Sequence, residues 1–380
     1  MPAGNTSVDK AVEAFTQAHA EWRAQRWDQA ARHAERSAAL FARALGPHDP
    51  DRANAQLLAA RARLTDGDHK AAHHQATQAL RTLEGCDDSG RVRVFRAQAH
   101  GLIGRAHEAT GDYPPAMANY RRALSAAQST DQPDLVCQTA MQLGVLCKHT
   151  GDYDQAADAY RTAEKALRAA APRDDEAWIA LDHNRGGLHH ASGNPEAALP
   201  YAIRALQRRQ NTQPPDPVAI ALERSAVAPI LIDLERYDEA QEHLDAARET
   251  FDEHLGPVDY ELAVVEHNLG ELARRRHNLT DAITHWQAAL QLKTQTLGPR
   301  HPDLAITHLN LAVVHHQAGN PVTANQCARQ AIALVQDVGS PTNPVFTRAT
   351  ELLSIIVTDQ QQAGPGRDPL RTEEESAPEP

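Results

Sequence analysis

Small residues, most of them apolar, recur along the chain at intervals of 40 to 44 residues, and three columns of them align in eight copies. The first column consists of Ala30, Ala72, Ala116, Ala156, Ala198, Ala240, Ala282 and Ala324. A second column of small residues lies seven positions after the first, and a third lies twelve positions before it. Because small side chains let helix backbones approach closely, the pattern predicts eight stacked pairs of antiparallel helices.

A short phrase of polar and turn-forming residues opens most copies of the repeat. In 151-GDYDQA-156 we expect Gly151 to take the left-handed conformation after one helix and Asp152 to cap the next. The same capping role is expected of Asn194 and Asn320, each followed by a proline that suits the first helical position. The phrase therefore predicts the turn inside each helical pair.

A second signature, seen at 45-LGPHDPD-51, 255-LGPVDYE-261 and 297-LGPRHPD-303, predicts the end of one pair and the start of the next. The small-residue columns, the GDY turns and this linker together resemble the tetratricopeptide repeat. The 42-residue period and the LGPxHPD linker are similar to the long repeats of kinesin light chains and many bacterial proteins. The resemblance covers residues 8–336 and implies an all-α fold, a right-handed superhelical α-solenoid of about eight helix-turn-helix repeats.

The end of the chain departs from the repeat. Residues 345–362 form one more amphipathic pattern, which predicts a helix that caps the exposed end of the stack. We therefore expect one domain over residues 8–362. The last stretch, 363–380, is rich in proline and acidic residues and is expected to be disordered.

Composition and motifs exclude several classes of protein. The net charge of −12 argues against a nucleic-acid partner, although local basic patches stay open. No apolar run of 18 residues predicts a membrane helix, and four irregularly spaced cysteines are typical of reduced thiols in a cytoplasmic protein. No nucleotide-binding, hydrolase, zinc or calcium motif is present, so neither enzymatic activity nor a cofactor is expected.

The concave face of such a superhelix is lined by the first helix of each pair, and the resemblance supports positions 18, 15, 14, 11, 8 and 7 before the anchor alanine. Residues there are mostly polar and basic, with few acids. Candidates for a peptide-binding groove are Arg61, Arg105, Gln142, Lys148, His183, Asn184, His267, Asn268, Arg274, Arg275, Asn310 and His316.

These candidates allow more than one interpretation. The resemblance implies that Asn184, Asn268 and Asn310 bond the backbone of an extended peptide, or else that they contact the neighbouring repeat. The basic residues either bind an acidic segment or are simply solvated. A further apolar anchor site is possible in repeats one and two, where the alternative is terminal packing; its residues are Phe15, Trp22, Leu57, Leu58 and Leu64. Histidines His183, His190 and His267 are spaced too widely for a metal site, although histidines along the groove suit a pH response.

The main hypothesis is an adaptor that binds a protein or peptide segment, expected to be acidic, in a basic groove. The acidic tail residues Glu373, Glu374 and Glu375 are proposed to occupy that groove when no partner is present. An alternative is a bacterial regulator that senses a small peptide and changes its superhelical pitch. A third alternative is an enzyme or accessory protein of a biosynthetic pathway. Neither nucleic acid nor a membrane is expected as a partner.

Overall fold

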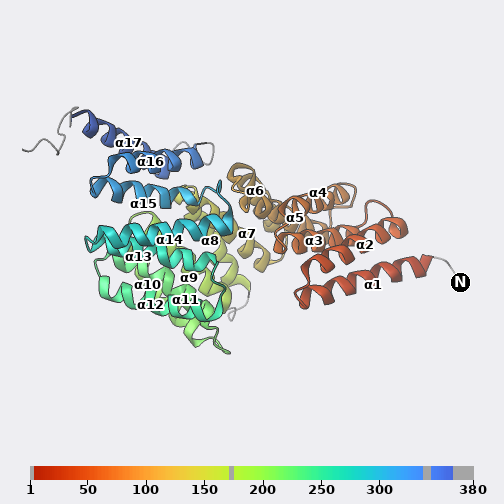
Figure 1. The fold of residues 1–380 in the computed structure, drawn as a ribbon. Coiled ribbons are helices and arrows are strands. Elements are labelled where there is room, and N and C mark those ends of the chain that lie inside the picture. Colours follow the sequence, from red (N-terminus) through yellow and green to blue (C-terminus); the bar gives the residue numbers. More distant parts are fainter. Residues whose placement is uncertain (1–3, 171–174, 337–343, 363–380) are drawn as a thin grey trace, which may run out of the picture.

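The computed structural model describes residues 4–170, 175–336 and 344–362, and the described residues form helices joined by short turns (Figure 1). The helices are α1 (Gly4–Arg23), α2 (Trp27–Leu45), α3 (Pro50–Thr65), α4 (His69–Glu84), α5 (Gly90–Glu108), α6 (Tyr113–Gln128), α7 (Pro133–His149), α8 (Tyr153–Ala170), α9 (Asp175–Ala191), α10 (Pro195–Asn211), α11 (Pro217–Asp233), α12 (Tyr237–His254), α13 (Tyr260–Arg275), α14 (Leu279–Leu297), α15 (Leu304–Gln317), α16 (Pro321–Val335) and α17 (Pro344–Gln362).

Consecutive helices pack in pairs, from α1 with α2 to α15 with α16, and α17 packs against α16 and α15. At most junctions the odd-numbered helix of one repeat also contacts the odd-numbered helix of the next. The odd-numbered helices therefore form the inner layer of a solenoid. This confirms the predicted all-α array of eight helical pairs with a final capping helix. The predicted tail at 363–380 lies outside the described residues.

The small-residue columns lie where the two helices of each pair cross. Every residue of the first two columns has an exposed fraction of 0%. In the third column, a Cβ atom added to Gly104 would lie 2.6 Å from the ring of Tyr120, and one added to Gly144 would lie 2.4 Å from Tyr160. Both distances are too short for a real contact, so glycine is required for the aromatic ring to pack against the helix.

The turns follow the sequence prediction with one exception. Gly151 has a φ of +83°, and Asp152 accepts a hydrogen bond of 3.2 Å from the backbone N–H three residues later. Asn194 caps α10 in the same way at 3.1 Å, but Asn320 makes no side-chain cap, so that part of the prediction is wrong. Repeat six, which lacks the turn glycine, places Glu235 in the left-handed region with a φ of +58°.

The stack returns on itself in its second half. Figure 1 shows α1 to α6 extending to one side of a more compact body that contains α7 to α17. The linker between α14 and α15 reaches the turn before α6 and the end of α7, where Asp303 contacts Tyr113 and His149. We call these three residues the seam, and the stretch of chain from the first to the last of them, 113–303, the ring. No helix among the described residues is long and apolar enough to cross a membrane.

Candidate functional site

Three cavities lie along the inner face of the second half of the stack, and two of them extend from the ring to the helices that follow it. Cavity A has a volume of about 500 Å³ and lies between α9, α11 and α13. Cavity B, of about 380 Å³, is lined by α11, α13 and α15, and it shares Pro229 and Asn268 with cavity A. Cavity C, also about 380 Å³, lies beside the seam and shares Ile306 and Arg348 with cavity B. Because neighbouring cavities share these residues, the lining is continuous from cavity A to cavity C.

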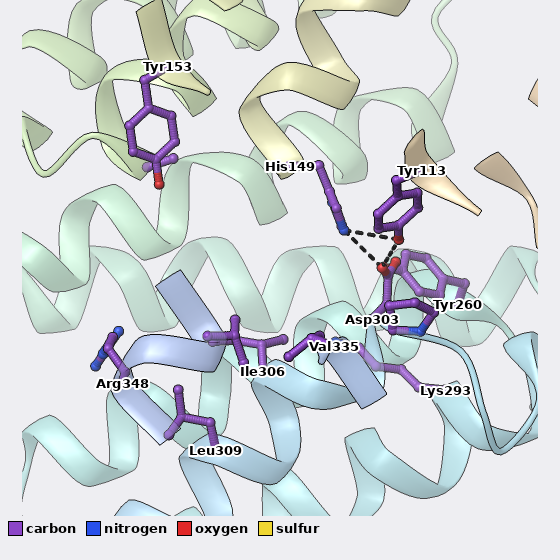
Figure 2. Close-up of a pocket in the computed structure, with 13 residues that line it drawn as sticks. Tyr113, His149, Tyr153, Tyr260, Lys293, Asp303, Ile306, Leu309, Val335 and Arg348 are labelled. Carbon is purple, nitrogen blue, oxygen red and sulfur yellow. Dashed lines mark hydrogen bonds and ion pairs between the residues drawn. The ribbon is translucent and has the colours of Figure 1, made fainter. Parts of the chain in front are cut away.

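The seam closes the ring through a buried carboxylate. Asp303 accepts a hydrogen bond of 2.8 Å from the Tyr113 hydroxyl and lies 3.0 Å from Nε2 of His149 (Figure 2). Burial alone would raise the pKa of Asp303. The pKa is nevertheless well below its usual range, because His149 contributes a hydrogen bond and a positive charge and Tyr113 contributes a second hydrogen bond. Burial and Asp303 together raise the pKa of Tyr113. The contact therefore joins an ionised carboxylate to a neutral phenol.

The three predicted asparagines line cavities A and B. Asn268 donates a hydrogen bond of 3.3 Å to the backbone carbonyl of Ser225 on the preceding inner helix. Asn310 donates one of 3.2 Å to Nε2 of His267. Asn184 lines cavity A with no partner among the described side chains. For two of the three, the contact with the neighbouring repeat is therefore present, and it leaves the amide oxygen without a partner among the described residues.

The predicted cations of repeat seven are neutralised by acids of the groove. Arg274 and Arg275 both pair with Glu271, at 2.6 Å and 2.8 Å. Arg275 also pairs with Asp233, at 2.5 Å, and His190 lies 2.9 Å from the same carboxylate. The hydrogen bond from His190 and the nearby arginines lower the pKa of Asp233. The two arginines of repeat seven are therefore paired with acids in cavity B.

The other predicted residues lie in different places. Arg61, Arg105 and Gln142 come together in a separate cavity of about 340 Å³ on α3, α5 and α7. Neither of these two arginines is in an ion pair with a described residue, and enclosure together with the neighbouring charge of Arg105 lowers the pKa of Arg61. Lys148 lines none of these cavities and lies against α9. His316 pairs at 3.5 Å with an aspartate of the capping helix.

Two of the predicted histidines connect neighbouring inner helices. Nδ1 of His183 lies 2.9 Å from Glu223 across α9 and α11. Burial and the charge of Lys293 lower the pKa of His267 well below its usual value, so His267 is neutral and bonds α15 through Thr307 at 3.3 Å. Within residues 4–170, 175–336 and 344–362, no group of three histidine, cysteine, aspartate or glutamate side chains is placed to hold a metal ion.

The apolar anchor site considered for repeats one and two is instead part of the core. Leu57 and Leu58 have exposed fractions of 2% and 5%, and Phe15 packs against the buried cluster that contains Leu58. Trp22 stacks edge-on against Trp27, with ring centroids 4.8 Å apart. Terminal packing therefore accounts for these residues.

Sequence reasoning missed the residues that surround the seam. Tyr113 belongs to a GDY turn of the repeat, and Asp303 to the linker signature, and neither pattern indicates that the two residues meet. Lys293 and Arg348, which also line cavity C, belong to no pattern of the repeat, whereas Tyr260 lies in the linker signature 255-LGPVDYE-261. The one usable signal was the linker 297-LGPRHPD-303, because two prolines and an acid outside the helices mark a segment that is free to make other contacts.

Comparison with protein families explains the repeated unit. A tetratricopeptide repeat model matches residues 11–85, 95–169 and 261–337, which is more than half of the chain. The chain belongs to the tetratricopeptide repeat family. Comparison with curated protein sequences gives no match.

Several solved structures share the tetratricopeptide fold along most of the chain. The quorum sensor NprR from B. thuringiensis, in its apo form, has a TM-score of 0.61 and 14% identity, covering 85% of this chain and 87% of NprR. A Rap protein complexed with Competence and Sporulation Factor has a TM-score of 0.58 and 11% identity, covering 93% of this chain and 99% of the Rap chain. Aspartyl phosphate phosphatase F from Bacillus subtilis has a TM-score of 0.58 and 14% identity, covering 78% of this chain and 73% of its own. At these identities the likeness shows a shared fold.

Proposed function

We propose that this protein is a non-catalytic, cytoplasmic peptide-sensing regulator that binds a short peptide along cavities A, B and C. The observation that carries the proposal is the seam, because it closes the inner face around the cavities through only a few polar contacts. A ligand inside the ring that contacts both sides of the seam changes the free-energy difference between closed and open forms.

Two further observations support a peptide as the ligand. The cavities form a long, continuous lining, and the amide oxygens of Asn268 and Asn310 are free to accept bonds from a peptide backbone. Among solved structures of the same fold, one is a Rap protein complexed with Competence and Sporulation Factor and another is named a quorum sensor. These likenesses support the choice of the sensing hypothesis over the adaptor.

Small-angle X-ray scattering with pools of synthetic linear peptides of about six residues tests the proposal. A binding pool should change the radius of gyration of the wild type, and Asn184→Ala should weaken binding because Asn184 lines cavity A. Asn211→Ala removes the same amide at the exposed end of α10 and is the matched control. If no pool binds, or if binding leaves the scattering curve unchanged in both the wild type and Asp303→Asn, the sensing proposal is wrong.

An adaptor of kinesin-light-chain type is the second candidate function. The observation that favours it is the pair Arg61 and Arg105, which line one cavity and are in no ion pair with a described residue. Two free guanidiniums on an inner face suit an acidic segment of a partner protein. Capture of a partner by the wild type but not by an Arg61→Ala, Arg105→Ala variant would support the adaptor function. Equal capture by both proteins would show that the two arginines are not the binding site.

A further inference from the structure

Lys293 is a buried cation on the wall of cavity C. Its exposed fraction is 5%, and its ammonium donates one hydrogen bond, of 3.3 Å, to Oγ1 of Thr307. It is in no ion pair with a described residue. An ammonium has three donors, and a buried donor without a partner destabilises the folded protein. A group of this kind beside a cavity is typical of a site where the ligand supplies the missing partner.

The charged groups around Lys293 leave cavity C with an excess of positive charge. Asp303 is the nearby acid, and it is already bonded to the two other residues of the seam. Burial lowers the pKa of both His267 and His301, so these neighbours are neutral at pH 7. Arg348 of the capping helix lines the same cavity and is in no ion pair with a described residue.

Between the two cations the wall of the cavity is aliphatic. In Figure 2, Ile306 and Val335 lie between Lys293 and Arg348, and Leu309 lies below them. A ligand that matches this wall has one negative group and an aliphatic body. A phosphate group fits less well, because its second negative charge would lie near the ionised Asp303.

On the basis of the proposed function, we propose that cavity C binds the C-terminal carboxylate of a short peptide whose last residue is aliphatic. Lys293 donates a charge-assisted hydrogen bond to the carboxylate, and Ile306 and Val335 contact the last side chain. The peptide then enters the ring with its C-terminus at the seam and its preceding residues in cavities B and A.

N-acetylleucine, N-acetylleucinamide and inorganic phosphate are the probes for this site, with binding to the full chain followed by saturation-transfer NMR at pH 7. N-acetylleucine should bind the wild type about tenfold more tightly than the amide, since only the acid gains the charge-assisted bond. Lys293→Met should lose this preference, and Lys70→Met, which removes an exposed ammonium on α4, should keep it. Equal binding of acid and amide, retention of the preference in Lys293→Met, binding of phosphate alone, or no binding of any probe would overturn the proposal.

Proton uptake on ligand binding gives a second readout, and it is expected only if Lys293 contacts the ligand. Burial lowers the pKa of Lys293 to about 8, and a bound carboxylate raises it again. Calorimetry at pH 8.5 in buffers of different ionisation enthalpy should therefore show proton uptake with N-acetylleucine in the wild type and none in Lys293→Met. Peptide pools that bind regardless of a free C-terminus would overturn this inference and leave the sensing function intact. Binding of N-acetylleucine without binding of any peptide pool would leave the carboxylate site intact and overturn the sensing function.

Discussion

At the scale of single residues, the protein keeps polar groups in places where an apolar side chain would be more stable. Lys293 shows this most clearly, because burial lowers its pKa from 10.5 to about 8. Between pH 8 and 10.5 the unfolded chain binds more protons at this position than the folded chain, so the free energy of unfolding rises with pH across that window. Below pH 8 the folded state carries the full cost of burying the charge.

Replacing this lysine should therefore stabilise the protein at neutral pH. Lys293→Met should raise the free energy of unfolding at pH 7 by up to about 3 kcal/mol, the value of a pKa difference of roughly 2.5 units. The gain should shrink as the pH rises from 8 to 10.5. Urea unfolding of the wild type and the variant at pH 7 and pH 9.5 measures both effects. If the free energy of unfolding of the variant changed with pH as much as that of the wild type, Lys293 would not be the titrating group.

At the scale of the helical pair, the close crossing of two helices depends on a few positions without a side chain. Gly104 and Gly101 lie one turn apart on α5 and differ in this respect. A Cβ atom at Gly104 would lie 2.6 Å from the ring of Tyr120, whereas the nearest atom to one at Gly101 is a glutamine oxygen 3.5 Å away. The same mutation should thus have opposite effects one turn apart.

Gly104→Ala should destabilise the protein by about 1 to 3 kcal/mol, because the buried ring must move to admit the methyl group. Gly101→Ala should stabilise it by about 0.5 to 1 kcal/mol, since alanine is the better helix former and the site has room. Thermal unfolding of the two variants beside the wild type measures both shifts. Destabilisation of equal size in both variants would contradict the packing argument.

Features contained in one helical pair could be predicted from the sequence, because the residues that determine them are close in the chain. The columns around Gly104, the left-handed Gly151 and the cap from Asp152 are of this kind. The seam could not be predicted in this way. Tyr113 and Asp303 are 190 residues apart, and their contact depends on small rotations that add up over successive repeats. The same holds for the surroundings of Lys293, which lines cavity C together with Pro302 and Asp303 of the linker.

At the scale of the whole molecule, the seam sets the shape of the second half of the stack. Gly111 has a φ of +74°, and a Cβ atom there would lie 2.6 Å from Cδ of Pro302 in the linker. Gly193 occupies the same place in its own repeat, with a φ of +78°, but no atom lies within 4 Å of its added Cβ. A comparison of substitutions at the two glycines therefore distinguishes the effect of local backbone strain from the effect of contact across the seam.

Gly111→Ala and Gly193→Ala should each cost about 1 kcal/mol of stability from the left-handed backbone alone. Only Gly111→Ala should also push the linker away and open the ring. Small-angle scattering should then show a larger radius of gyration for Gly111→Ala than for Gly193→Ala. If the two variants scatter alike, the seam does not hold the ring closed in solution.

The contact between Asp303 and Tyr113 also constrains how a gene of this kind can change. Tetratricopeptide arrays grow and shrink by duplication or loss of whole repeats, and an open solenoid tolerates either change. Here, one repeat gained or lost between α7 and α14 would carry Asp303 round the superhelical axis and away from its partners. Repeats added before α5 would leave that distance unchanged. The count of repeats is therefore fixed by geometry in the second half of the protein and free to vary at its beginning.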